Sequence, residues 1–253
     1  VALGVLGHAS SIDELVSLAT DDARGRKLMG KASVDERTRT YAAYGLGLSA
    51  NRAVDEDLRA SVYATLASLL DTNERRDLEV AAVLSIGLVP LDAEGCGAQV
   101  DRLLAVFRDK TGDALVRAHV PRSLALLLSE GDVWQGPAAD AKRAEVAGVL
   151  LEALDRFADE PREVVQSCAL ALSRLAMGQD ELAQKVQREL TKLPEVHADL
   201  QVRAFSCIAL GELAGGSDPV RAREAQTELI RRLVKGKSTL RPWAALGLGV
   251  AGY

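Results

Sequence analysis

The chain has 253 residues, of which 48% are hydrophobic but only 4% aromatic, so small and aliphatic side chains must build its core. Its net charge of −5 argues against a nucleic-acid partner, which would require a continuous basic surface to displace counterions. The strongest basic runs, 24–27 and 231–237, are short, and we interpret them as solvated helix ends and loops. No apolar run reaches the roughly 18 residues of a membrane span, so we expect no membrane insertion.

Six segments align without gaps and predict six equivalent helices. In every segment the ninth residue is a large aliphatic and the tenth is small, as in Leu46-Gly47 and Leu210-Gly211. A large side chain beside a small one lets neighbouring helices pack closely. The segments start at Thr38, Leu78, Val116, Val164, Val202 and Leu240.

A second helical pattern precedes each of these segments. Its apolar residues recur at intervals of three and four, as in Leu182, Val186 and Leu190. The residues Ser217-Asp218-Pro219 mark one helix start, because a capping side chain precedes a proline in the first turn. The preceding helices are predicted at Ile12–Thr20, Glu56–Leu70, Gln99–Arg108, Ala141–Phe157, Glu181–Leu193 and Val220–Val234.

Together the two patterns predict an all-α fold, an α-solenoid of about six antiparallel helix pairs that forms a single unit over residues 1–253. Residues 1–7 are expected to end a further, partial helix, and the wider spacing between the third and fourth segments predicts an insertion at 129–140. The repeats are expected at about 11–50, 55–90, 97–129, 140–177, 179–215 and 218–253.

The segment VRAFSCIALGELAGGSDP, which starts at Val202, resembles a HEAT repeat of the bacterial phycobilisome-lyase-like type. The matching features are the opening Val-Arg, the small residues inside the helix and the Leu-Gly near its end. This resemblance implies a HEAT/armadillo-like superhelix, with Asp113 paired to Arg117 and Asp199 paired to Arg203. The segments YAAYGLGLSA and AALGLGVAGY also resemble proteasome/cyclosome repeats, which are helical pairs of similar length and form the second option.

Residues that could carry catalysis are not grouped along the chain. The histidines His8, His119 and His197 are scattered, and there is no phosphate-binding loop or nucleophile elbow. No His, Cys and carboxylate cluster has the spacing of metal ligands. We therefore expect no catalytic residue, no cofactor and no metal site. The lyase-like resemblance implies one alternative, a bilin lyase-like enzyme or a chaperone-type accessory factor on the same fold.

The three cysteines, Cys96, Cys168 and Cys207, are odd in number and widely spaced, so they predict no disulfide framework. Two of them lie in apolar helical runs, where cysteine acts as a small hydrophobic residue. Unpaired cysteines favour a reducing compartment such as the cytoplasm for a soluble chain. The first residue is Val1 rather than methionine, which leaves an upstream targeting segment open.

The fourth, seventh and eleventh positions of the six segments line the concave face in a HEAT-type solenoid. In this chain most of these positions are apolar or aromatic, and such exposed patches usually mark interaction surfaces. We predict that another protein binds there; tight curvature that buries the stripe is the alternative. Trp134, in the insertion, is a second candidate contact. The candidate protein-binding residues are Tyr41, Tyr44, Leu48, Leu84, Leu88, His119, Arg122, Trp134, Phe205, Ile208, Trp243 and Leu246.

The two ends of the sequence lack the polar cap of a terminal solenoid repeat. We therefore expect further repeats or partner subunits to continue the stack at one or both ends, within a larger protein or assembly.

Overall fold

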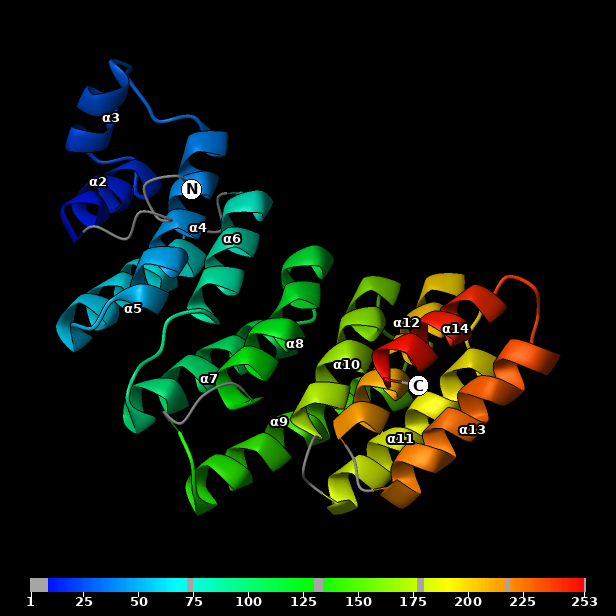
Figure 1. The fold of residues 1–253 in the computed structure, drawn as a ribbon. Helices are drawn as coiled ribbons and strands as arrows, with labels where there is room; N and C mark the ends of the chain where they lie inside the picture. The colour runs from blue at the N-terminus through cyan, green and yellow to red at the C-terminus, as the bar shows by residue number, and fades with distance from the viewer. Residues whose placement is uncertain (1–8, 72–74, 130–133, 177–179, 217–218, 253) are drawn as a thin grey trace. The chain divides into compact units, whose positions relative to one another are not determined.

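The computed structural model describes residues 9–71, 75–129, 134–176, 180–216 and 219–252, and all regular structure in these ranges is helical (Figure 1). The chain divides into two compact units, residues 1–135 and 136–253. The all-α prediction is confirmed for the described residues. That all repeats form a single solenoid stays a prediction, since each unit is described by itself.

The first unit contains three successive helix pairs, in which α2 packs on α4, α5 on α6, and α7 on α8. The second helices of these pairs also pack on one another in the order α4, α6, α8. A short helix, α3, follows α2 along the chain and packs on it. The bounds are α2 Ala9–Ala19, α3 Ala23–Met29, α4 Glu36–Arg52, α5 Glu56–Asp71, α6 Arg76–Ile86, α7 Ala93–Arg108 and α8 Ala114–Ser129.

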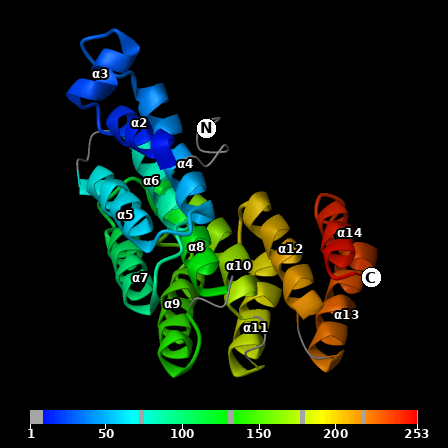
Figure 2. The same ribbon diagram turned by 60° about the vertical axis from the view of Figure 1, so that its left-hand side comes forward.

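The second unit repeats the arrangement with α9 on α10, α11 on α12, and α13 on α14. Figure 2 shows α9, α11 and α13 in one row and α10, α12 and α14 in a second row beside it. The bounds are α9 Pro137–Asp155, α10 Arg162–Leu175, α11 Asp180–Val196, α12 Leu200–Gly216, α13 Pro219–Lys235 and α14 Arg241–Val250.

All twelve helices expected from the periodicity are present, and the structure adds two local features. Residues 23–29 form the short helix α3, which the periodicity did not predict, because Asp22 caps the helix start through the Gly25 amide and Gly30 ends it at a φ of 61°. Within the predicted insertion at 129–140, α9 already begins at Pro137. The partial helix predicted at 1–7 and residues 130–133 of the insertion lie outside the described residues.

Residues at the ninth and tenth positions of the aligned segments pack between neighbouring helices, as the sequence predicts. The ninth-position side chains are buried, from Leu46 on α4 to Leu248 on α14. A Cβ on Gly47 would lie 2.7 Å from the Cβ of Ser85, and a Cβ on Gly87 would lie 2.7 Å from that of Ser123. Real Cβ contacts are longer, so these two glycines allow the backbones of neighbouring helices to approach.

Buried serines add polar contacts between the same helices in the first unit. The Ser85 hydroxyl on α6 donates a hydrogen bond of 2.9 Å to the Ala43 carbonyl on α4. The Ser123 hydroxyl on α8 donates an equivalent bond of 2.9 Å to the Val83 carbonyl on α6. Equivalent hydrogen bonds therefore join α4 to α6 and α6 to α8, as expected for repeated units.

The Asp and Arg residues that the HEAT resemblance pairs have other partners. Asp113 accepts hydrogen bonds from the amides at the start of α8, and Asp199 accepts one of 3.0 Å from the Val202 amide. The guanidinium near Asp199 belongs to Arg162, at 3.7 Å. In the described residues no side-chain hydrogen bond or ion pair joins Asp199 to Arg203, and only the Arg203 backbone amide donates to the Asp199 carbonyl, at 3.3 Å, so the implied side-chain pair is wrong.

Gln99 secures the end of α6 from the neighbouring helix α7. Its buried side-chain amide donates to the carbonyls of Ile86 and Val89, at 3.2 and 2.9 Å. Carbonyls at a helix end lack helical donors and are costly to bury without a partner.

Replacing Gln99 with leucine is expected to lower the free energy of unfolding by about 1–2 kcal/mol, because two carbonyls lose their donor. Loss of the unpaired Oε1 of Gln99 offsets part of that cost. Denaturant unfolding measures the change. The matched variant Gln184→Leu, at an exposed position of α11, should alter stability by less than about 0.5 kcal/mol. Equal effects at both positions would contradict the capping role.

Candidate binding surface

The candidate binding surface consists of the twelve residues that the sequence predicts as protein contacts. None of them is fully buried: Tyr41 is 44% exposed, Leu246 is 49% exposed, Arg122 is exposed, and the others are half-buried. The ninth-position residues of the same helices, by contrast, face the core. The second helices therefore have one face in the core and a second, largely apolar face that keeps access to solvent.

In the first unit, Tyr41, Tyr44 and Leu48 follow one face of α4. Leu84 lies on the equivalent face of α6, and Leu88 follows directly after the end of that helix. The guanidinium of Arg37 lies 5.7 Å from the centre of the Tyr41 ring, within cation–π range. Burial raises the pKa of Tyr44 above its ordinary value, and the negative charge of Asp77 adds to the rise. The phenol is therefore neutral at physiological pH.

The polar part of this surface is on α8, where His119 is half-buried and Arg122 is exposed. Burial lowers the pKa of His119, and the nearby Arg122 charge lowers it further. The imidazole is therefore neutral near pH 7 and can both donate and accept a hydrogen bond.

In the second unit, the surface is formed by Phe205 and Ile208 on α12 and by Trp243 and Leu246 on α14. The Phe205 and Trp243 rings are 6.4 Å apart and meet edge to face, at an interplanar angle of 79°. Such a pair is rigid and keeps part of each ring accessible. Val250, at 43% exposure, extends the same face of α14.

Trp134 is half-buried in the first unit. It lines a small cavity of about 90 Å³ together with Asn51, Leu88, Cys96 and Leu127. The side-chain amide of Asn51 donates to the Leu88 carbonyl at 2.9 Å across the same region. Trp134 therefore packs near the ends of α6 and α8, and the structure brings it together with Leu88 alone among the predicted contacts.

The structure thus gathers the predicted residues into two groups, one in each unit. A second group of polar residues, which the sequence interpretation missed, lies at the ends of α11 and α13. Arg232 belongs to the basic run that we interpreted as solvated, yet it is only 4% exposed. Its position on the inner face of α13, four residues after Glu228, is the sequence signal that could have identified it.

Two of the three cysteine thiols have a pKa above the ordinary value. Cys96 and Cys207 are buried, and burial raises the pKa of each thiol to about 11, so both stay protonated. Within the described ranges no group of three or more His, Cys, Asp or Glu side chains is placed to hold a metal ion. Among the helices that can be described, none has the length and apolar character needed to cross a membrane.

The arrangement of successive helix pairs defines an all-helical repeat-like fold. A solved structure of an engineered protein matches 95% of this chain and 98% of its own, with a TM-score of 0.53 and 20% sequence identity. A second engineered protein matches 94% of this chain and 58% of its own, with a TM-score of 0.49 and 19% identity. No protein-family model and no curated protein matches the sequence. The first of these likenesses supports the fold alone.

Proposed function

We propose that this protein is a non-catalytic scaffold or binding module that holds another protein against the candidate binding surface. We also propose that its helix pairs are repeats of the HEAT type, on the basis of the Val-Arg and Leu-Gly pattern around Val202 and Leu210. A repeat-like fold by itself indicates no activity, so the proposal depends on the surface.

One observation carries the proposal. Aromatic and aliphatic side chains recur on the solvent-accessible face of successive second helices, although the core face of each helix is already supplied with Leu or Ile. Apolar residues on an accessible face stabilise the fold less than core residues do, but they supply the desolvated contacts of a protein interface. The Phe205–Trp243 pair is of the residue type found at the energetic centre of such interfaces.

Site-specific photo-crosslinking tests the proposal. A photoreactive phenylalanine at Tyr41 or Trp243 should give a discrete crosslinked protein when the chain is illuminated in extracts of its source cells. The same group at Val220, which is 68% exposed on α13 and outside the surface, is the control. Equal crosslinking at Val220 would argue for nonspecific contact.

Charge substitution then measures the contribution of the surface. Tyr44→Asp and Trp243→Asp are expected to weaken binding of the crosslinked partner about thirtyfold or more, because hot-spot residues contribute about 2 kcal/mol. Circular dichroism should show unchanged helicity. Loss of folding in both variants would favour the alternative, in which the stripe is buried within the protein.

A further inference from the structure

A cavity of about 230 Å³ lies in the second unit, where α11 and α13 end, beside the first turns of α12 and the loop before α14. Pro194 and Glu195 of α11 and Leu240 of the loop form part of its wall. Drug-sized pockets start at about 300 Å³, so this cavity suits a small ligand. None of its lining residues belongs to the proposed protein-binding surface, although Arg203 is on α12, the helix that also carries Phe205.

The cavity wall carries a strong excess of positive charge. Glu195 is the only carboxylate among the described lining residues. Glu228 does not line the cavity, but it forms ion pairs with Arg231 and Arg232. Two carboxylates cannot neutralise five cations, so about three positive charges remain for a ligand. The cationic lining residues are Arg203, Arg231, Arg232, Lys235 and Lys237.

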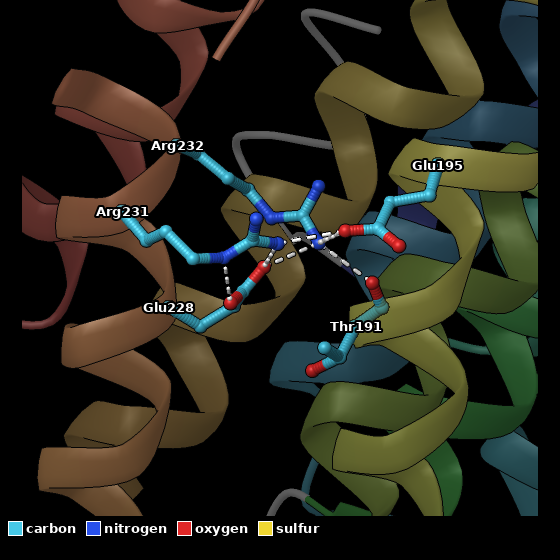
Figure 3. A network of polar contacts seen from close by, with 5 residues as sticks. All are labelled: Thr191, Glu195, Glu228, Arg231 and Arg232. Atoms are coloured by element: carbon cyan, nitrogen blue, oxygen red, sulfur yellow. Dashed lines mark hydrogen bonds and ion pairs between the residues drawn. The ribbon is translucent and has the colours of Figure 1, made fainter. Parts of the chain in front are cut away.

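Figure 3 shows how two of these cations are held in place. Arg231 donates to Glu228 through Nε at 2.8 Å and to Glu195 through Nη2 at 2.7 Å. The neighbouring Arg232 donates through Nη2 to the Thr191 carbonyl at 2.6 Å and pairs with Glu228 at 2.5 Å. Burial alone would raise the pKa of Glu228, but its bonds with the two arginines lower it, so the carboxylate stays ionised. The network orients both guanidinium groups rigidly.

Part of the buried Arg232 remains without a partner. The side chain is only 4% exposed, and its Nε is buried with no hydrogen-bond acceptor. A buried guanidinium N–H that donates to nothing costs free energy, and buried donors in proteins normally have a partner. A ligand oxygen can reach this Nε only if the Arg232 guanidinium turns toward the cavity, because the atom itself has no accessible surface.

Arg203 carries a second donor that has no partner. It differs in this from the arginines at the same position of other repeats. Arginines at the same segment position in three other pairs donate Nε to a carbonyl at the end of their own first helix. These bonds join Arg39 to Ala19, Arg117 to Phe107 and Arg241 to Gly236, at 2.9, 3.0 and 2.9 Å. The Nε of Arg203 is buried and has no such partner in the described residues.

The helix dipole does not explain why a cation is found at position 203. Cations are favourable at helix C-termini, which accounts for Arg232 and Lys235 in the last turn of α13. Arg203 is instead in the first turn of α12, which begins at Leu200, where the dipole disfavours a positive charge. Its side chain lines the cavity, and its Nε has no carboxylate or carbonyl partner to offset that cost.

We propose that this cavity is an anion site that binds the phosphate group of a small ligand, with Arg203 and Arg232 as the principal donors and Lys237 as a loop contact. A phosphate dianion presents several acceptor oxygens, which match the forked donors of arginine. Its double charge also suits the excess of positive charge better than a single carboxylate does. Free phosphate and a small phosphate ester share this chemistry.

Isothermal titration calorimetry of the full chain tests the site, with inorganic phosphate and glycerol 3-phosphate as probes at constant ionic strength. We expect saturable binding of one equivalent of at least one probe, which identifies the source of the phosphate group. Arg203→Gln should weaken it about tenfold or more, since charged hydrogen bonds are the strong ones. Lys237→Gln, on an exposed loop, should weaken it less, and Arg223→Gln, exposed on α13, should leave it unchanged.

Stability without phosphate gives a second, independent readout. Because the Nε of Arg203 has no protein acceptor, Arg203→Gln should not lower the denaturation midpoint in phosphate-free buffer. Phosphate should raise that midpoint for the unmodified chain and for Arg223→Gln, but not for Arg203→Gln. Failure of both probes to bind up to about 10 mM, a very weak affinity, overturns the proposal. Binding that persists in Arg203→Gln and Lys237→Gln overturns it equally.

Discussion

Replacing Gly211 with alanine is expected to lower the free energy of unfolding by about 3 kcal/mol, at the upper end of the usual cost of overpacking a core. A Cβ at this position would lie 2.1 Å from the carbonyl oxygen of Gly247 on α14. That oxygen is backbone, so no side-chain rotation can relieve the overlap, and α12 and α14 must move apart. Denaturant unfolding followed by circular dichroism measures the loss.

Gly249 provides a matched control in the same column of the alignment. It lies on α14, and a Cβ there would meet no atom within 4 Å. Gly249→Ala should leave stability unchanged or raise it by up to about 1 kcal/mol, because alanine is the better helix former. If Gly211→Ala were as well tolerated as Gly249→Ala, close approach would not be the reason for glycine at the tenth position.

Replacing Leu46 with alanine is expected to lower the free energy of unfolding by about 2–5 kcal/mol, the usual cost of truncating a core leucine. Leu46 is fully buried on α4, in the ninth-position column that packs between helices. The truncation removes apolar contacts and leaves a cavity that helices held by Gly47 and Ser85 cannot readily close. Thermal and denaturant unfolding of the variant give the magnitude.

Leu48, two residues further along α4, tests the other face of the same helix. It is half-buried, so Leu48→Ala should cost only about 1 kcal/mol, in proportion to the apolar area that it removes from water. A loss equal to that of Leu46→Ala would mean that the eleventh position is a core position. The proposed protein-binding surface would then lose its support in the first unit.

The helices were predictable because their signals are local. Apolar spacing along α11 and the capping aspartates before α4 and α12 act within one or two turns, and they are legible without any tertiary contact. The unpredicted helix α3 depends on equally local caps. It was missed because its seven residues are polar and too few for periodicity to be detected.

The candidate binding surface was predictable in its residue types and in its phase on each helix. A stripe at the fourth, seventh and eleventh positions must lie on one helical face, and the structure leaves that face accessible from Tyr41 to Leu246. Trp134, which the sequence places in the insertion, has no position that periodicity could predict, because its place depends on tertiary packing near Leu88 and Leu127.

By itself, the sequence determined the helical periodicity, the pairing of successive helices and the small residues where helices meet, since each follows from spacing along one chain. Only the tertiary structure decided that Arg232 is buried and that Arg203, unlike Arg117, lacks a carbonyl partner. The physical reason is that burial and hydrogen bonding depend on residues distant in sequence. The sequence of a basic run does not show whether its side chains face solvent or line a cavity.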